Sequence, residues 1–275
     1  MSEHRHALRP VPRLEPGADP WSRFAAATPA RINLGRSGDA LPTRALLEFQ
    51  ADHARARDAV HGKVEVERLA AQLAPWPSLA VNSRAASRAV YLRRPDLGRR
   101  LDAADAESLA ALADPTWDLA LVVADGLSAQ AVMHQAVPTL LAIRAALPGW
   151  RLAPVVLARQ ARVALGDEVG QILQAPLVAV LVGERPGLSV ADSLGIYLTY
   201  APAVGCRDAA RNCISNIHGA GLSPQDAAAK LAWLATHARR LRLTGVALKE
   251  DAAPAALPVT PSIPASYDSK EGAGR

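Results

Sequence analysis

Beyond Pro115 the sequence alternates between short, almost wholly apolar runs and longer stretches with helical periodicity. Short apolar runs bounded by turn signals are typical of strands buried on both faces, and such strands belong to parallel sheets covered by helices. We predict strands at Leu119–Ala124, Pro154–Ala158, Leu177–Val182 and Gly195–Tyr200. Helices are expected at 128–147, 166–173 and 224–243. This alternation predicts an α/β fold with an open, mostly parallel, Rossmann-like sheet that has helices on both faces.

The segment before Pro115 shows helical spacing and no long apolar run. Intervals of three and four predict an amphipathic helix with its apolar positions at Leu46, Phe49, His53, Ala56 and Val60. Two further helices are expected at 64–73 and 83–91. The proline-rich ends lack hydrophobic periodicity, which is typical of segments without a core of their own. We therefore divide the chain into a flexible extension (1–27), a helical lobe (28–114), an α/β domain (115–247) and a disordered tail (248–275).

Charge and cysteine content exclude several classes of protein. The formal net charge is +5, and the stretch Arg84–Arg100, with six arginines against one aspartate, has an excess of the same size. Aromatic residues make up 4% of the chain and no nucleic-acid-binding signature occurs, so we expect no nucleic-acid partner. Cys206 and Cys213 are expected to be reduced thiols, because the chain has no other cysteine to build a disulfide framework.

The longest apolar runs are far shorter than the roughly 20 residues that a membrane-spanning helix needs. Residues 1–21 mix charges and prolines without an apolar stretch, so we expect no signal peptide. The sequence therefore predicts a cytoplasmic protein with no membrane partner.

Motifs of several common enzyme classes are missing. No Gly-x-Gly-x-x-Gly follows the first predicted strand, and no Gly-x-x-x-x-Gly-Lys-Ser/Thr occurs, which disfavours dinucleotide and nucleoside-triphosphate enzymes. Gly-x-Ser-x-Gly and His-Glu-x-x-His are also absent, so neither a serine hydrolase nor a zinc protease is indicated. Asp-x-His-x-x-Gly, through which some cobalamin proteins bind cobalt, is absent as well. We predict no metal site and no catalytic residue on this chain.

Loops that follow parallel strands meet at the carboxyl edge of the sheet, where ligands bind in such folds. Four loops are expected to share this rim: Asp125–Ser128, Arg159–Val163, Gly183–Leu188 and Cys206–Gly221. Glu184 follows the most apolar strand and is a candidate ligand residue, or else a partner of Arg185. Cys213 is expected to be a small buried apolar side chain, since no ligand spacing supports a metal or nucleophile role.

One alternative function uses residues of the same rim. A stand-alone small-molecule-binding or hydrolytic α/β protein would act through Asp125, Ser128 and His218. The simpler interpretation is that Asp125 turns the chain, Ser128 caps the next helix and His218 is structural.

Five segments, in order and with matching spacing, resemble the small (light) subunit of ethanolamine ammonia-lyase. They are Thr28–Thr43, Leu46–Val60, Val123–Ala129, Val182–Leu188 and Arg211–His218. The resemblance extends from residue 28 to residue 247. It implies a subunit of an adenosylcobalamin-dependent lyase that converts ethanolamine to acetaldehyde and ammonia by a radical mechanism.

In that family a large TIM-barrel subunit carries the substrate, and base-on adenosylcobalamin lies between the two subunits. The resemblance implies cofactor contacts by Val163, Glu184 and Cys213. Relatives have Gly-Arg-Val where this chain has Ala161-Arg162-Val163. Position at the rim adds four secondary candidates, Asp125, Gly126, Arg185 and Ser215.

The resemblance also bears on partners and location. The helical lobe with Arg84–Arg100 is the expected contact with the large subunit. Many members of the family work inside a bacterial microcompartment, so such a compartment is a second expected location beside the open cytoplasm.

Overall fold

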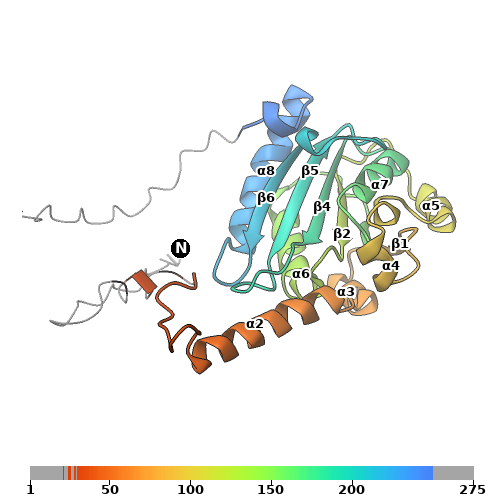
Figure 1. Ribbon diagram of the computed structural model, residues 1–275. Coiled ribbons are helices and arrows are strands. Elements are labelled where there is room, and N and C mark those ends of the chain that lie inside the picture. The colour runs from red at the N-terminus through yellow and green to blue at the C-terminus, as the bar shows by residue number, and fades with distance from the viewer. Residues whose placement is uncertain (1–20, 22–23, 26–27, 29, 250–275) are drawn as a thin grey trace, which may run out of the picture.

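Six strands form one continuous sheet in the computed structural model, which describes residues 21, 24–25, 28 and 30–249. The strands are β1 (Ser78–Asn82), β2 (Ala120–Ala124), β3 (Val155–Arg159), β4 (Leu177–Gly183), β5 (Leu194–Tyr200) and β6 (Arg211–Ile217). They lie in the order β1-β3-β2-β4-β5-β6 (Figure 1). The pairings β1–β3, β3–β2 and β2–β4 are parallel, whereas β4–β5 and β5–β6 are antiparallel. The predicted α/β fold with an open, mostly parallel sheet is confirmed.

Helices cover both faces of this sheet, as predicted. They are α2 (Thr43–His61), α3 (Val66–Leu73), α4 (Arg88–Arg93), α5 (Ala103–Ala110), α6 (Ala129–Ala146), α7 (Leu165–Leu173) and α8 (Pro224–Leu241), with 3₁₀ turns at Leu97–Arg99, Asp208–Ala210 and Gly245–Ala247. Successive strand residues point to opposite faces. Leu121 and Val123 of β2 accordingly join a core with α3, α6 and α8, while Ala120 and Val122 join a core with α5 and α7.

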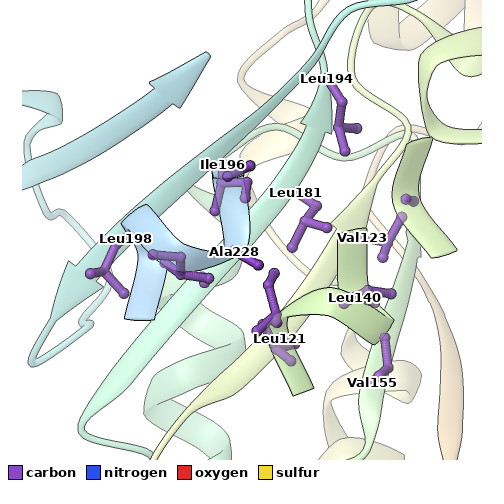
Figure 2. Close-up of a cluster of buried hydrophobic side chains, with 14 of the residues drawn as sticks. Leu121, Val123, Leu140, Val155, Leu181, Leu194, Ile196, Leu198 and Ala228 are labelled. Atoms are coloured by element: carbon purple, nitrogen blue, oxygen red, sulfur yellow. The ribbon is translucent and has the colours of Figure 1, made fainter. Parts of the chain in front are cut away.

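The larger core explains the apolar runs of the sequence. Figure 2 shows Leu140 of α6 and Ala228 of α8 among side chains of β2, β4 and β5. Every residue of β2 and of β4 is buried. Because helices cover both faces, these strands need apolar residues at every position instead of at alternate positions.

Helix starts follow the capping signals of the sequence. Ser128 Oγ accepts the N–H of Ala131 at 3.1 Å at the start of α6. Ser223 Oγ accepts the N–H of Asp226 at 3.1 Å, and Pro224 occupies the first position of α8. These side chains satisfy N–H groups that have no partner inside the helix.

Two strands lie where the sequence predicts none. β1 falls inside the segment 28–114, so the prediction of a purely helical lobe is wrong, and its pairing with β3 makes it part of the sheet. Only Val81 of β1 is buried, which removes the apolar signal of a strand. β6 falls inside the predicted loop 206–221. The sequence gives no apolar run there, because exposed and buried residues are mixed along this edge strand. The helix predicted at 83–91 begins later, at Arg88.

The predicted terminal segments lie largely outside the described residues. Of the tail 248–275, Leu248 is described and is buried, and its carbonyl accepts a hydrogen bond from Asn212 Nδ2 at 2.8 Å. The folded part therefore extends at least one residue beyond the predicted boundary. Within the described part of the chain, no helix is both long enough and apolar enough to span a bilayer.

The first half of α2 projects from the body of the molecule (Figure 1). Ala59, near its C-terminal end, is the only buried residue of this helix. Leu46, Leu47 and Phe49 are 42%, 58% and 40% exposed. Neighbouring apolar side chains that remain in water mark a surface suited to burial by another molecule.

Candidate functional site

A hollow at the carboxyl edge of the parallel strands unites three of the four predicted loops. It has a volume of about 250 Å³ and is lined by Tyr91, Gly126, Leu127, Arg162, Val163, Val182, Gly183, Glu184, Arg185 and Tyr197. A second hollow of about 220 Å³ shares Arg162, Val163 and Tyr197 with it. Val163 and Glu184 therefore lie on one surface, as the order of the strands predicts.

This surface is open on one side. Pockets that enclose a drug-sized ligand have volumes of roughly 300–1,000 Å³, and each hollow here is smaller. A larger ligand placed on this surface would be covered only in part.

Glu184 is held at the rim with part of its carboxylate unused. Oε2 accepts hydrogen bonds from Ser193 Oγ at 2.5 Å and from the N–H of Asn216 at 3.4 Å. The carboxylate lies over Gly195, where an added Cβ would come within 2.8 Å of Oε1. No described residue hydrogen-bonds to Oε1, and the sequence-based pairing with Arg185 is wrong. One carboxylate oxygen is therefore left to accept a hydrogen bond from a ligand.

Cys213 lies on β6 directly opposite Tyr197 in the antiparallel register. Its predicted place in a loop is wrong, and it borders a different hollow from the one that Glu184 lines. Burial raises the pKa of the Cys213 thiol; a hydrogen bond with Tyr197 opposes this shift and the charge of Glu184 adds to it. Burial likewise raises the pKa of Tyr197 to about 12, with further contributions from Cys213 and Glu184. Tyr197 thus connects Cys213 to the hollow, and both groups are neutral near pH 7.

Tyr91 lies between two guanidinium groups on the opposite side of the hollow. The central carbons of Arg162 and Arg88 lie 4.6 and 4.9 Å from the centre of its ring. Burial is the main reason that the pKa of Tyr91 is raised well above its usual value. Arg162 Nε and Gln160 Oε1 are buried without a hydrogen-bond partner among the described residues. Unpaired buried polar atoms are unusual in a folded protein, and these two lie in the segment that follows β3.

Comparison with known proteins assigns the chain to a family. The family model described as "Ethanolamine ammonia-lyase light chain" matches residues 18–249. This chain belongs to the ethanolamine ammonia-lyase light-chain family. An ethanolamine ammonia-lyase small subunit from Bradyrhizobium diazoefficiens is 56% identical over 232 residues, which are 82% of this chain and 88% of the relative.

Two further relatives support the assignment to the light-chain family. The ethanolamine ammonia-lyase small subunit of Xanthomonas campestris pv. campestris is 55% identical over 244 residues, covering 86% of this chain and 90% of the relative. That of Pseudomonas syringae pv. tomato is 51% identical over 242 residues, covering 86% and 84%. The resemblance seen in the sequence is confirmed over nearly the whole described chain.

The alternative hydrolytic set does not form in this light chain. Ser128 Oγ donates to the carbonyl of Ala191 at 2.7 Å and caps α6, so it is fully engaged. His218 Nε2 pairs with Asn216 Oδ1 at 2.7 Å. Asp125 bonds neither of them and pairs with Arg88 instead. A catalytic triad through these residues is excluded by their partners.

The four secondary candidates for cofactor contact do not share one hollow in this light chain. Gly126 and Arg185 line the first hollow, and Gly126 has a φ of +55° with no room for a Cβ, which would lie 2.3 Å from the carbonyl oxygen of Gly183. Asp125 is buried beneath the rim. Ser215 lines a separate hollow between β6 and α8, which Cys213 also borders. No group of three or more His, Cys, Asp or Glu in the described residues is arranged to hold a metal ion.

Sequence reasoning misses three residues of this surface, namely Tyr91, Arg162 and Tyr197. Tyr91 is on α4, in a segment assigned to a separate lobe, and reaches the rim only through tertiary packing. Tyr197 occupies an interior position of β5, where an aromatic residue is ordinary. The light chain contains only four tyrosines, and their rarity is the one signal that singles them out.

Proposed function

We propose that this chain is the small subunit of an ethanolamine ammonia-lyase and forms one wall of its adenosylcobalamin site. The complex would convert ethanolamine to acetaldehyde and ammonia, with the substrate on the large subunit. The observation that carries this proposal is the one-sided surface on which Val163 and Glu184 lie beside the Tyr197–Cys213 pair. A surface of this kind needs a second wall, and the relatives' designation as small subunits points to a large partner.

The lining of the hollow suits a corrinoid. The rim of a corrin ring carries primary amides, which both donate and accept hydrogen bonds. Glu184 Oε1 is an acceptor, and the guanidinium groups of Arg162 and Arg185, which line the same hollow, are donors. The donor and acceptor set of the wall therefore fits the periphery of the cofactor.

Each contact residue has a distinct role in this proposal. Glu184 accepts a hydrogen bond from a peripheral amide, with its other oxygen held by Ser193. Val163 and Cys213 make van der Waals or backbone contacts. Adenosylcobalamin, when bound, supplies the radical chemistry through homolysis of its cobalt–carbon bond, while protein groups bind and orient it. No histidine lines either hollow, in keeping with a cofactor that retains its own base.

The stretch Arg84–Arg100 offers the large subunit less uncompensated charge than its six arginines would suggest. Arg88, Arg94 and Arg100 form ion pairs within the chain, whereas Arg84 and Arg93 donate only to backbone carbonyls and keep their charge uncompensated. Arg99 borders the second hollow. The exposed apolar face of α2, formed by Leu46, Leu47 and Phe49, offers a second surface for the same partner. We include both the arginine stretch and this face in the proposed interface.

Reconstitution tests the proposed function. The chain alone is expected to release no acetaldehyde from ethanolamine, and the chain mixed with the large subunit and adenosylcobalamin is expected to release it. Acetaldehyde is measured with a coupled dehydrogenase. Full activity of the large subunit alone, or none from the assembled pair, would overturn the proposal.

A further inference from the structure

The segment that carries Val163 leaves β3 through a disfavoured backbone conformation. Gln160 has a φ of +54°, in the left-handed region that residues with a side chain rarely adopt. Such a conformation persists only where surrounding contacts hold it. These contacts therefore determine where Arg162 and Val163 lie in the hollow.

Asp125 supplies the central contacts to this segment. Its Oδ2 accepts the N–H of Gln160 and its Oδ1 accepts the N–H of Ala161, each at 2.8 Å. Asp125 is 5% exposed and directly follows β2, the neighbour of β3 in the sheet. One buried carboxylate thus binds two successive N–H groups just before Arg162 and Val163.

Arg88 balances the charge of this carboxylate. Its Nη1 lies 3.4 Å from Asp125 Oδ2 and donates to the carbonyl of Gly126 at 2.9 Å. Its Nε donates to the carbonyl of Val60 at the end of α2, at 2.7 Å. Burial raises the pKa of Asp125, while the N–H of Ala161 and the charge of Arg88 oppose that shift. The pair therefore joins α2, α4 and the turns after β2 and β3.

Three more hydrogen bonds hold the same segment from other parts of the fold. They run from Ser83 Oγ to Gln160 O (2.6 Å), from Tyr91 Oη to Ala161 O (3.1 Å) and from Arg162 N to Gly98 O (2.8 Å). Ala161 is consequently held at its N–H by Asp125 and at its carbonyl by Tyr91. The backbone of the site loop is fixed by side chains that do not themselves need to touch a ligand.

We propose that Asp125 is a positioning residue for the cofactor wall: through the N–H groups of Gln160 and Ala161 it sets the place of Arg162 and Val163 against the corrinoid. This inference rests on the proposed function and extends it to a residue that makes no contact with the cofactor. An asparagine at position 125 would turn an N–H₂ group toward one of the two N–H donors. The loop would then lose one anchor while the strand core stays intact.

Asp118 provides a matched control at the other end of β2. It precedes β2, its Oδ2 accepts the N–H of Arg151 at 2.9 Å, and its Oδ1 lies 2.9 Å from Arg239 Nη1. It therefore performs the same backbone-anchoring task as Asp125 at the opposite end of β2. Asp118→Asn reports the effect of losing a carboxylate on stability alone.

The experiment uses the complex of large and small subunits with Asp125→Asn, Asp118→Asn or Glu184→Ala. Equilibrium dialysis with cyanocobalamin gives Kd, and steady-state kinetics give the KM for adenosylcobalamin and kcat at saturation. For Asp125→Asn we expect both Kd and KM to rise tenfold or more, with kcat within a factor of two of the unmodified complex. Asp118→Asn is expected to leave Kd within a factor of two.

Unchanged Kd and KM in assembled Asp125→Asn complex would overturn the inference, as would an equal rise for Asp118→Asn. If Asp125→Asn does not assemble, Ser83→Ala decides, since Ser83 lines neither hollow and its hydroxyl donates to the Gln160 carbonyl; a threefold or larger rise in Kd supports the inference and an unchanged Kd rejects it. Glu184→Ala distinguishes failure of the positioning role from failure of the proposed function. Weaker binding with Glu184→Ala but not with Asp125→Asn rejects only the positioning role, whereas no cobalamin binding by the unmodified complex rejects the proposed function.

Discussion

The carboxylate of Asp167 and the guanidinium of Arg211 form a bidentate ion pair with both side chains only 1% exposed. The two hydrogen bonds measure 2.5 and 2.8 Å. Arg211 also donates to Thr199 Oγ1 at 3.0 Å and to the carbonyl of Cys206 at 3.1 Å. A single side chain therefore joins α7 to the two antiparallel strands β5 and β6.

Asp167→Ala is expected to lower the free energy of unfolding by about 3–5 kcal/mol, because it removes the buried partner of Arg211 and leaves only the pair with the exposed carboxylate of Asp208. Urea denaturation of the purified chain measures this loss. The matched control is Glu48→Ala, which breaks the exposed pair with Arg44 and is expected to cost no more than about 0.5 kcal/mol. Equal losses for the two variants would contradict the structural role of the buried pair.

Glu168 gives the stability of the chain a pH dependence in acid. Burial raises its pKa, but hydrogen bonds from Arg100 and from the N–H of Leu101 outweigh burial, and the pKa lies below its usual value. A carboxyl whose pKa is lower in the folded state contributes stability above its unfolded pKa, and this contribution disappears as the pH falls through the folded value. The urea midpoint of the unmodified chain should exceed that of Glu168→Gln at pH 7. The difference between the two midpoints should shrink as the pH falls below about 4.3, the usual pKa of Glu. A difference that grows in acid would contradict this.

Cys213 is expected to react slowly with iodoacetamide: the residue as a whole is exposed, but partial burial of its thiol raises the pKa and keeps the thiol protonated. Mass spectrometry of the labelled chain between pH 7 and 10 should show its rate rising at higher pH than that of a cysteine in a short unstructured peptide. Bound cobalamin should slow the labelling of Cys213 further in the complex. Faster labelling of Cys213 than of the peptide at pH 7 would show that the thiol is activated.

The apolar face of α2 gives a prediction about assembly. Leu47→Glu with Phe49→Glu should reduce the fraction of chain that co-elutes with the large subunit in size-exclusion chromatography, since both side chains are exposed here and would be buried by a partner. The matched control is Leu141→Glu on α6, a leucine that is 46% exposed. Normal assembly of the double variant would place the interface elsewhere.

Much of the fold is predictable because its central strands are buried on both faces. β2 and β4 consist only of buried residues, so their sequences are continuous apolar runs. β1 and β6 lie at the two edges of the sheet, where neighbours cover them incompletely. Local sequence carries little signal for such strands, since their place depends on pairing with β3 and β5.

The site residues likewise divide into those that local sequence places and those that only tertiary packing brings to the rim. The shared rim of the loops that carry Glu184 and Val163 is predictable because parallel strands end at a common edge, whereas Val163 itself is singled out only by the family resemblance. The place of Tyr91 is not predictable, because its hydroxyl meets the carbonyl of Ala161 across 70 positions of sequence. Asp125 is assigned from sequence to a simple turn, whereas the fold uses its carboxylate to hold the segment after β3.

Cobalamin affinity of the Glu184→Ala complex tests the central claim most directly, with Asp192→Ala as control because Asp192 lies on the same loop and faces His134. Equilibrium dialysis of each complex with cyanocobalamin gives Kd. Loss of a buried hydrogen bond worth about 1–3 kcal/mol predicts a Kd roughly 5 to 150 times higher for Glu184→Ala, and an unchanged Kd for Asp192→Ala. An unchanged Kd for Glu184→Ala would contradict the assignment of this rim as a wall of the cofactor site.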